Sequence, residues 1–394
     1  MSTITLRGMT WDHPRGYDPL VRGAPLFEAA NPGIRIEWEK RSLREFGEAP
    51  LDRYAERYDL IIIDHPFAGF AASHSYLIDW SAHLSAEEQA AFAADSVGRS
   101  WESYRYKDRV WALPIDAATQ VSSFRPDLMD RLGQEPPRTF EEVLHLAERA
   151  RAKGLAITTT AFPTDAISTV ISIAANLGHA IVDDTPVFLP PTIGREVLAR
   201  FHAIVDAAHP TATSSNPITA YELMTSGDEI AYCVYGYGYT NYSRPAPGKR
   251  RLRFTDVPAH GPNGCAGTQL GGTGVAVSAL SKNGDAAVRY GKWLCGPAHQ
   301  GSDYFRLGGQ PASLAAWTNP DLNEGCDNFF RNTLATLQSA HVRPRFDGWI
   351  PLFEEGGDRA TACMKREITD EAFIDWINAE FAHAQERAGV GVRA

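Results

Sequence analysis

The amino-acid sequence predicts an α/β protein with more than one domain. The N-terminal part of the chain alternates strand-like and helix-like segments, β-α-β-α-β, which favours a parallel sheet with right-handed crossovers. A length of 394 residues with 44% apolar content predicts two or three domains, each with its own core. The tripeptide Asp-His-Pro follows two strand-like runs, as Asp12-His13-Pro14 and Asp64-His65-Pro66. Because ligands of open α/β sheets bind outside the carboxyl ends of the strands, these tripeptides predict a polar cleft.

The first five elements are predicted from residue periodicity and stop signals. The alternating segment 34–39 is typical of a half-buried strand, and the apolar run 60–63 is typical of a fully buried one. Asn31-Pro32-Gly33 ends the helix that precedes the first of these strands. The expected elements are a strand at 4–11, a helix at about 17–30, a strand at 34–39, a short polar helix at about 43–58 and a strand at 60–63.

The middle of the chain is predicted from turn and capping residues. Lys107-Asp108 forms the turn of a hairpin, and Pro126 opens a helix as a first-turn proline. Thr139 and Glu142 form a capping box for the next helix. The expected elements are a hairpin at 105–114, a strand at 121–124, helices starting at Pro126 and at Thr139, a strand at 155–159, and helices at about 165–177 and 193–208.

The C-terminal part contains a strand that leads into an aromatic, glycine-rich stretch, Tyr235-Gly236-Tyr237-Gly238-Tyr239. A second glycine-rich stretch, 271–274, opens another strand. The expected elements are a strand within 227–239, strands at 252–257 and 271–278, a helix at 283–294, and a last helix at about 370–388 capped by Thr369.

Composition excludes several functional classes. A net charge of -10 argues against nucleic acid and anionic membrane surfaces as partners, because both require a basic footprint. No apolar run is long enough for a membrane-spanning helix. The 5 cysteines are scattered and show no zinc-type spacing, which predicts reduced, structural thiols. The chain enters a strand directly after Met1 without a leader pattern, so we expect a cytoplasmic protein, or a periplasmic one if a leader was removed.

Several motifs in the middle of the chain resemble those of one known family, in the same order and spacing. They are Trp111-Ala112-Leu113-Pro114-Ile115-Asp116, Phe124-Arg125-Pro126-Asp127-Leu128, Thr139-Phe140-Glu141-Glu142, Gly271-Gly272-Thr273-Gly274-Val275-Ala276-Val277-Ser278 and Gly308-Gly309-Gln310-Pro311-Ala312. The family is the extracellular solute-binding proteins of ABC sugar transporters. The resemblance implies an α/β, two-lobed type II periplasmic-binding-protein-like fold with a hinge and an interlobe cleft. It places lobe 1 at about 1–116 and 258–312, and lobe 2 at 117–257 and 313–394.

The candidate ligand-binding residues combine polar groups with aromatic rings. Rings of Tyr235, Tyr237 and Tyr239 at period two would lie on one side of a strand and stack on a sugar, or else pack within the sheet. Arg15 suits a carboxylate or phosphate ligand, or a structural salt bridge. The full set is Trp11, Asp12, His13, Arg15, Asp64, His65, Asp116, Gln120, Tyr235, Tyr237, Gly272, Thr273, Gln310, Arg345 and Trp349.

Three roles remain open for the two Asp-His pairs. They contact a ligand, they only cap the helices that follow, or, with Asp116, they hold a divalent metal. No recognised ligand spacing supports the metal, so neither a metal nor a cofactor is expected.

Two functions remain open as well. The first is a solute-binding protein that captures a small polar, sugar-like or hydroxylated ligand between two lobes, with an ABC transporter permease as partner if it is exported. The alternative is a cytosolic enzyme on the same fold, a lyase, hydrolase or isomerase. In that case His13 or His65 would be the general base, and Asp12 and Asp64 would orient it. No catalytic motif decides whether the chain is an enzyme.

Overall fold

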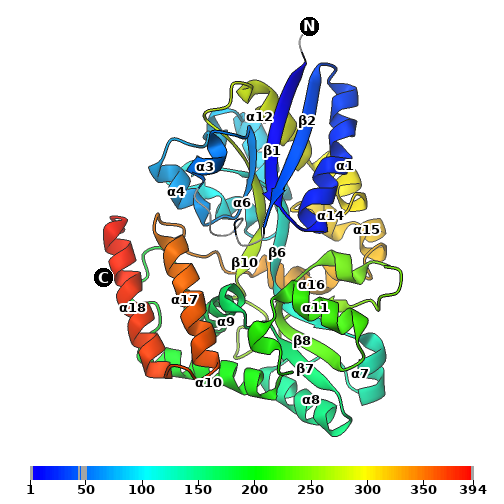
Figure 1. Cartoon of the computed structure of the whole chain (residues 1–394), viewed down its shortest axis with the longest axis vertical. Helices are drawn as coiled ribbons and strands as arrows, with labels where there is room; N and C mark the ends of the chain where they lie inside the picture. The colour runs from blue at the N-terminus through cyan, green and yellow to red at the C-terminus, as the bar shows by residue number, and fades with distance from the viewer. Residues whose placement is uncertain (1–2, 43–44, 46–50, 392–394) are drawn as a thin grey trace. The chain divides into compact units, whose positions relative to one another are not determined.

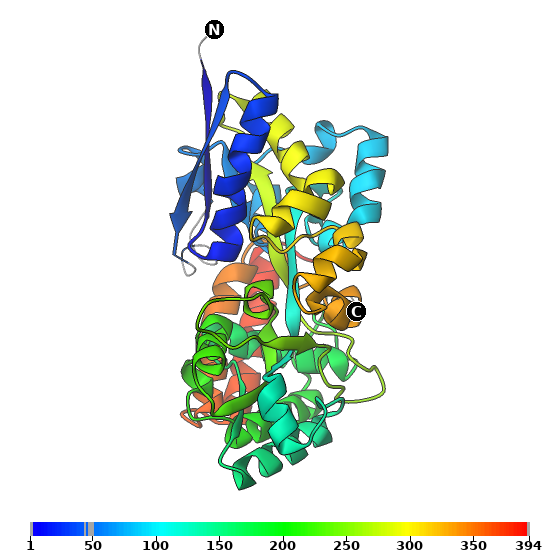
Figure 2. The same ribbon diagram turned by 90° about the vertical axis from the view of Figure 1, so that its right-hand side faces the viewer.

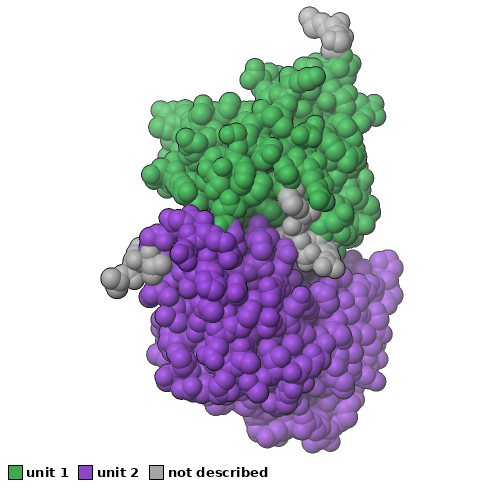
Figure 3. All heavy atoms as spheres, turned by 60° about the vertical axis from the view of Figure 1, so that its left-hand side comes forward, with its two compact units in different colours: residues 1–117, 271–322, 345–347 green, residues 118–270, 323–344, 348–394 purple. Residues whose placement is uncertain are grey.

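The chain folds into two compact α/β units. The computed structural model describes residues 3–42, 45 and 51–391. Unit 1 comprises residues 1–117, 271–322 and 345–347, and unit 2 comprises residues 118–270, 323–344 and 348–394 (Figure 3). The predicted two-part α/β organisation, with the chain passing between the parts more than once, is therefore confirmed. No helix among the described residues combines the length and apolarity that a membrane span requires.

Unit 1 contains the N-terminal elements and returns late in the chain. Its elements are β1 (Ile4–Trp11), α1 (Pro14–Ala30), β2 (Ile34–Arg41), α3 (Asp52–Ala55), β3 (Leu60–Ile63), α4 (Phe67–Ser73), η1 (Trp80–Ala82), α5 (Ala86–Asp95), α6 (Ser100–Ser103), β4 (Arg105–Tyr106), β5 (Arg109–Val110), α12 (Gly284–Cys295), α13 (Pro297–His299), η4 (Gln300–Tyr304) and α14 (Leu314–Thr318). Three elements cross the unit boundary: β6 (Leu113–Phe124), β10 (Leu270–Val277) and α15 (Pro320–Glu324).

The strands of unit 1 follow the order β2-β1-β3-β10 (Figure 1). β1 is parallel to both β2 and β3, as the alternation of strands and helices predicts. β10 is antiparallel to β3, so the sheet is mixed rather than wholly parallel. Helix α1 packs along β1 and β2, as the second ribbon view also shows (Figure 2). Its apolar residues, such as Leu20 and Phe27, are buried in one core with Leu6 and Trp38 of these strands.

Unit 2 consists of a smaller set of strands covered by helices. Its elements are α7 (Pro126–Leu132), α8 (Phe140–Ala152), β7 (Ala156–Thr159), α9 (Pro163–Asn176), α10 (Pro191–Ala207), η2 (Ala212–Ser214), α11 (Pro217–Ser226), β8 (Ile230–Tyr237), η3 (Thr240–Ser243), β9 (Arg253–Thr255), α16 (Phe329–Gln338), α17 (Trp349–Met364) and α18 (Asp370–Arg387). Strand β8 lies between β6 and β7, and β9 pairs with β6. Helix α9 packs against α17, which packs in turn against α18 (Figure 1).

Most predicted elements are present with boundaries shifted by a few residues. The turn at Lys107-Asp108 joins β4 to β5, and both residues have positive φ. Thr139 caps α8 as predicted, but the Glu142 carboxylate accepts from the Arg138 N–H instead of closing the box on Thr139. Thr369 caps α18 by accepting from the Ala372 N–H. The polar helix expected at 43–58 lies largely outside the described residues, and only α3 is seen within its range.

Two expectations differ from the structure. The strand expected at 121–124 is the end of one long strand, β6, which the sequence hides because Asp116, Gln120 and Ser122 are polar and yet buried. The compact units divide at 322/323 rather than at the expected 312/313, and at 270/271 rather than at the expected 257/258. The segment before this point belongs to unit 2 because Asn176 of α9 accepts from the His260 N–H and donates to two carbonyls, of Gly264 and Ala266.

Residues 345–347 belong to unit 1 because they pass directly over helix α4. An ideal Cβ at Gly69 would lie 1.6 Å from the Arg345 carbonyl oxygen, so no side chain fits there. We predict that Gly69→Ala lowers the free energy of unfolding by at least about 1–3 kcal/mol, the usual effect of overpacking. Urea unfolding measures the change. Gly284→Ala is the control, because a Cβ at Gly284 meets no atom within 4 Å; equal stability of the two variants would contradict this packing.

Candidate functional site

Three strand ends come together at one edge of the unit 1 sheet. In the parallel β1–β3 pair, Gly8 lies opposite Leu60 and Met9 opposite Ile61, so Asp12 and Asp64 follow neighbouring strands at the same level. In the antiparallel β3–β10 pair, Gly274 lies opposite Ile63, which brings Thr273 to the same edge. We call Asp12, Asp64, Asp116, Gly272 and Thr273 the unit 1 edge. The register thus gathers side chains that the sequence separates by more than two hundred residues.

A buried ion pair links this edge to the start of helix α1. The Arg15 guanidinium donates to both carboxylate oxygens of Asp116, through Nε at 2.7 Å and through a terminal nitrogen. Both side chains are almost fully buried, with 4% and 0% exposed. Burial raises the pKa of the Asp116 carboxyl, and the Arg15 guanidinium opposes this shift. Of the two roles considered for Arg15, the structure shows the salt bridge.

Strand β10 passes very close to β6 beside this ion pair. Gly272 has a φ of 101°, in the left-handed region that favours glycine. An ideal Cβ at this position would lie 2.2 Å from the Asp116 carbonyl oxygen. Glycine at position 272 thus allows the backbones of β10 and β6 to approach closely.

The two Asp-His pairs form local contacts of different kinds. His13, rather than Asp12, is the N-cap of α1, and its Nδ1 accepts from the Arg15 N–H at 3.1 Å. Asp12 is exposed and pairs with Lys40 at 2.6 Å. Asp64 accepts from the backbone N–H of His65 at 2.7 Å, while the His65 ring is buried with its edge toward Tyr104. The expected cap by the aspartates is thus wrong, since His13 caps α1 and no side chain of the described residues caps α4, which starts after Pro66. Contact with a ligand stays a prediction for all four residues.

The remaining candidates of unit 1 are held by structural contacts. Trp11 is a buried member of the unit 1 core. Gln310 is fully buried and donates to the Ala117 carbonyl at 2.7 Å. Arg345 donates to the carbonyls of Glu102 and Arg105 and lies over the Tyr106 ring. A direct contact with a ligand stays a prediction for each of these residues.

In unit 2, Gln120 is part of a buried hydrogen-bond network. Its amide donates to Thr169 and to the Tyr235 carbonyl, and its oxygen accepts from Ser172 at 2.6 Å. The three tyrosines of the glycine-rich stretch do not share one environment, because Tyr235 has a φ of 61° that interrupts the strand alternation. The Tyr235 ring lies 5.7 Å from His260, whereas the Tyr239 ring packs near Tyr242.

Trp349 and Tyr237 differ in exposure. Trp349 begins helix α17, is 1% exposed, and packs among Phe188, Phe353 and Phe381. Tyr237 is half-buried, and its hydroxyl accepts from the Gln269 amide at 2.7 Å. Of the predicted aromatic contacts, Tyr237 therefore combines partial exposure with a polar group, which suits ligand binding best.

Two polar residues of unit 2 were missed by the sequence analysis. Asp165, in the first turn of α9, is 5% exposed and forms no side-chain hydrogen bond or ion pair with the described residues. Burial raises the pKa of its carboxyl to about 8. Gln269 donates to Ser168 and Tyr237, but its Oε1 has no partner among the described residues. An aspartate in the first turn is ordinary in a helix, so the sequence carried no signal that marks Asp165.

Comparison with known proteins identifies what this arrangement is similar to. The sequence profile of the bacterial extracellular solute-binding proteins matches residues 10–301. No curated protein sequence matches the chain. Among solved structures, a maltose-bound protein of T. maritima is 18% identical with a TM-score of 0.81, and the comparison covers 97% of this chain and 100% of that one.

Two further structures show the same fold. A solute-binding protein of Agrobacterium radiobacter in complex with ribitol is 21% identical with a TM-score of 0.79, over 97% of this chain and 99% of that one. The GacH receptor of Streptomyces glaucescens, solved unliganded and with acarbose, is 16% identical with a TM-score of 0.82, over 98% of this chain and 99% of that one. At these identities the likeness establishes the fold, which is the one that the sequence motifs imply.

The Arg15–Asp116 pair gives a first prediction for this site. Arg15→Met leaves the Asp116 carboxylate buried without its partner, and we expect a loss of about 3–5 kcal/mol in the free energy of unfolding. The double variant Arg15→Met/Asp116→Leu should recover most of the loss, because no buried charge remains. Lys40→Met, which breaks an exposed pair, should change stability little. Urea unfolding separates these cases, and a double variant no more stable than Arg15→Met would contradict the argument.

Asp165 gives a prediction about pH. Its folded pKa of about 8 lies above the unfolded value of about 3.9, so unfolding releases a proton between these pH values and stability falls as pH rises. Near pH 8, we expect the free energy of unfolding of Asp165→Asn to exceed that of the natural chain by about a few kcal/mol. Near pH 4, we expect this difference to vanish. Urea unfolding across this range tests it; a difference that does not vary with pH would refute it.

Proposed function

The chain belongs to the bacterial extracellular solute-binding proteins, and we propose that it binds a small hydroxylated ligand, a sugar or a polyol, reversibly. The observation that carries the proposal is the family match over residues 10–301. Fold-level relatives hold maltose, ribitol and acarbose, all of which are neutral and rich in hydroxyl groups. These ligand names belong to the relatives, and they support the class of ligand rather than its identity.

The charges at the unit 1 edge favour a neutral ligand. Two cations near this edge have carboxylate partners, Arg15 with Asp116 and Lys40 with Asp12. A third, Arg41 at the end of β2, donates to the Ile62 carbonyl. Asp64 is partly exposed, and its carboxylate is a hydrogen-bond acceptor. Thr273 is 4% exposed, and its buried hydroxyl has no hydrogen-bond partner among the described residues. An acceptor and an unsatisfied hydroxyl suit a sugar or polyol hydroxyl better than an anion.

The enzyme alternative has no support from the comparisons. All the similar proteins named above are described by what they bind. Within this chain, His13 Nδ1 serves as the cap of α1, and His65 is 1% exposed. The cap formed by His13 and the burial of His65 give both histidines a structural role, so neither requires a catalytic one.

The family also suggests where the chain works and with what partner. Its members are described as extracellular, and the ribitol-bound relative is the binding protein of an ABC transporter. We propose that this chain acts outside the cytoplasm and delivers its ligand to an ABC transporter permease. The cytoplasmic location expected from the chain's first residues has no support. Closure of two lobes over the ligand, which the sequence resemblance implies, remains a prediction.

Thr273 provides the test of the ligand-binding role. A thermal-shift screen of sugars and polyols identifies a ligand, and calorimetry then measures its affinity for the natural chain and for Thr273→Val. This substitution removes the hydroxyl and keeps the shape, so we expect affinity to fall by about 2–10-fold, the effect of one net hydrogen bond, with no loss of folding stability.

Thr273→Ser is the matched control, because it keeps the hydroxyl and should retain most of the affinity. Unchanged affinity in Thr273→Val would remove this residue from the site. If no sugar or polyol in the screen bound, the proposed ligand class would be wrong.

A further inference from the structure

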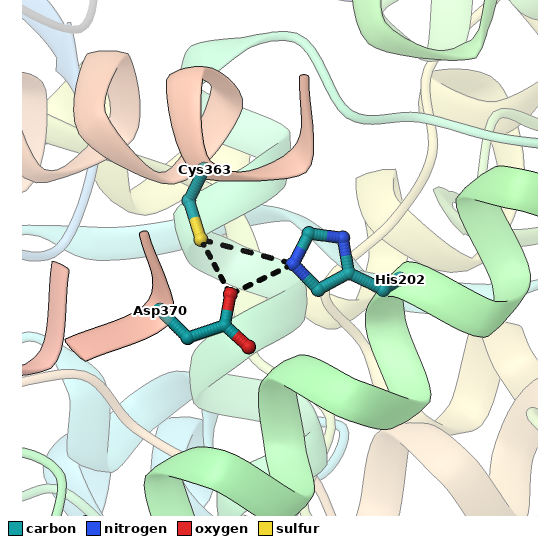
Figure 4. Close-up of side chains that lie close together, drawn as sticks. All are labelled: His202, Cys363 and Asp370. Atoms are coloured by element: carbon teal, nitrogen blue, oxygen red, sulfur yellow. Dashed lines mark hydrogen bonds and ion pairs between the residues drawn. The ribbon is translucent and has the colours of Figure 1, made fainter. Parts of the chain in front are cut away.

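Three helices of unit 2 bring together a histidine, a cysteine and an aspartate. His202 lies on α10, Cys363 near the end of α17, and Asp370 at the first position of α18; their side chains point toward one another (Figure 4). His202 Nε2 lies 2.9 Å from Asp370 Oδ1 and 3.9 Å from Cys363 Sγ, and Sγ lies 3.3 Å from Oδ1. One ligand atom from each residue therefore lies within 4.8 Å of the others.

The separations are close to those of a tetrahedral metal centre. Zinc bonds of about 2.0–2.3 Å to nitrogen, oxygen and sulfur separate the ligand atoms by about 3.4–3.6 Å. The observed separations of 2.9, 3.3 and 3.9 Å differ from these by about half an ångström or less. Side-chain rotations alone suffice for such changes, because the three residues come from helix ends and faces that already touch.

We propose that His202, Cys363 and Asp370 bind a zinc ion that joins helices α10, α17 and α18. A thiolate with an imidazole and one carboxylate is a donor set that selects zinc over magnesium or calcium, which prefer oxygen ligands alone. The fourth position of the tetrahedron would be taken by water, since Asp370 is 31% exposed and opens the site toward solvent.

The protons on the three groups must be rearranged when the ion binds. Without an ion, the Cys363 thiol donates to Asp370, and burial raises the pKa of this thiol to about 12. Binding forms the zinc–sulfur bond, and the thiol proton leaves to solvent. The imidazole binds through Nε2 as the neutral tautomer with its proton on Nδ1, an atom that has no partner among the described residues. Zinc affinity should therefore fall as the solution becomes more acidic.

The site is separate from the proposed ligand site, so the two can fail independently. All three residues lie in unit 2, whereas the ligand test uses Thr273 of unit 1. No metal-binding spacing is visible in the sequence, because 161 positions separate the first two residues of the set. Only the packing of the C-terminal helices against α10 brings them together.

The experiment measures zinc and cobalt binding to the full chain, purified without a histidine tag. After dialysis against zinc and then against metal-free buffer, we expect one zinc per chain by elemental analysis and a higher melting temperature than for the chelator-treated protein. Cobalt should give the near-ultraviolet absorption band of a thiolate-ligated ion. Cys363→Ser and Asp370→Asn should each weaken zinc binding by at least about tenfold, since loss of an outer partner alone weakens it 10–100-fold.

Cys265→Ser is the matched control, because Cys265 is another thiol of unit 2 outside the cluster, and it should bind zinc like the natural chain. Absence of retained zinc would overturn the proposal and leave the three groups as a hydrogen-bonded contact between helices. Equal zinc binding by Cys363→Ser and by the natural chain would also overturn it, as would a cobalt complex without a thiolate band. Circular dichroism of each variant shows whether a loss of binding reflects unfolding, and Asp370→Asn, which keeps an oxygen acceptor, is the variant least disruptive to the fold.

Discussion

The buried ion pair between Arg15 and Asp116 organises the part of unit 1 on which the candidate site depends. Asp116 lies just before the point where β6 leaves unit 1, and Arg15 lies in the first turn of α1. The pair therefore ties the start of a helix to a strand about a hundred residues away in the sequence. Burying two charges is unfavourable unless they are well paired, so both groups must keep this geometry. Gln310 and Gly272 add a hydrogen bond and a close backbone contact at the same place.

The polar groups near this arrangement are of two kinds, those with protein partners and those with none among the described residues. Arg15, Asp116, Gln120 and Gln310 are polar, buried and engaged with protein partners. By contrast, Thr273 Oγ1 and Gln269 Oε1 are buried acceptors without a partner among the described residues. Buried polar groups are nearly always satisfied, so each of these atoms lacks a hydrogen bond that the described residues do not supply. A binding site for hydroxyl groups agrees with this pattern and with the family to which the chain belongs.

In unit 2, helix packing brings together polar residues that lie even farther apart in the sequence. Its helical layer combines α9 and α10 with α17 and α18 from the end of the chain. The packing buries Asp165 without a side-chain partner among the described residues, and it brings His202 to Cys363 and Asp370. Each of these residues is ordinary in its own helix. Asp165 is a first-turn acid, and the other three are single side chains on three different helices. Their chemistry arises only from contacts between helices.

The sequence by itself determined the local elements and the fold class. Alternation, caps and turn residues located β1, β2, β3, α8, α18 and the hairpin at Lys107-Asp108, because these signals act within a few residues. The motif order from Trp111 to Ala312 was sufficient for the two-lobed fold.

Tertiary structure alone decided which polar residues are paired. His13, rather than Asp12, became the cap, Arg15 found Asp116, and Tyr235 left the strand alternation through its positive φ. It also decided that β6 is one long strand, since its polar residues are buried only because distant groups satisfy them. Hydrogen bonds and burial depend on neighbours far along the chain, and periodicity within a short window does not contain that information.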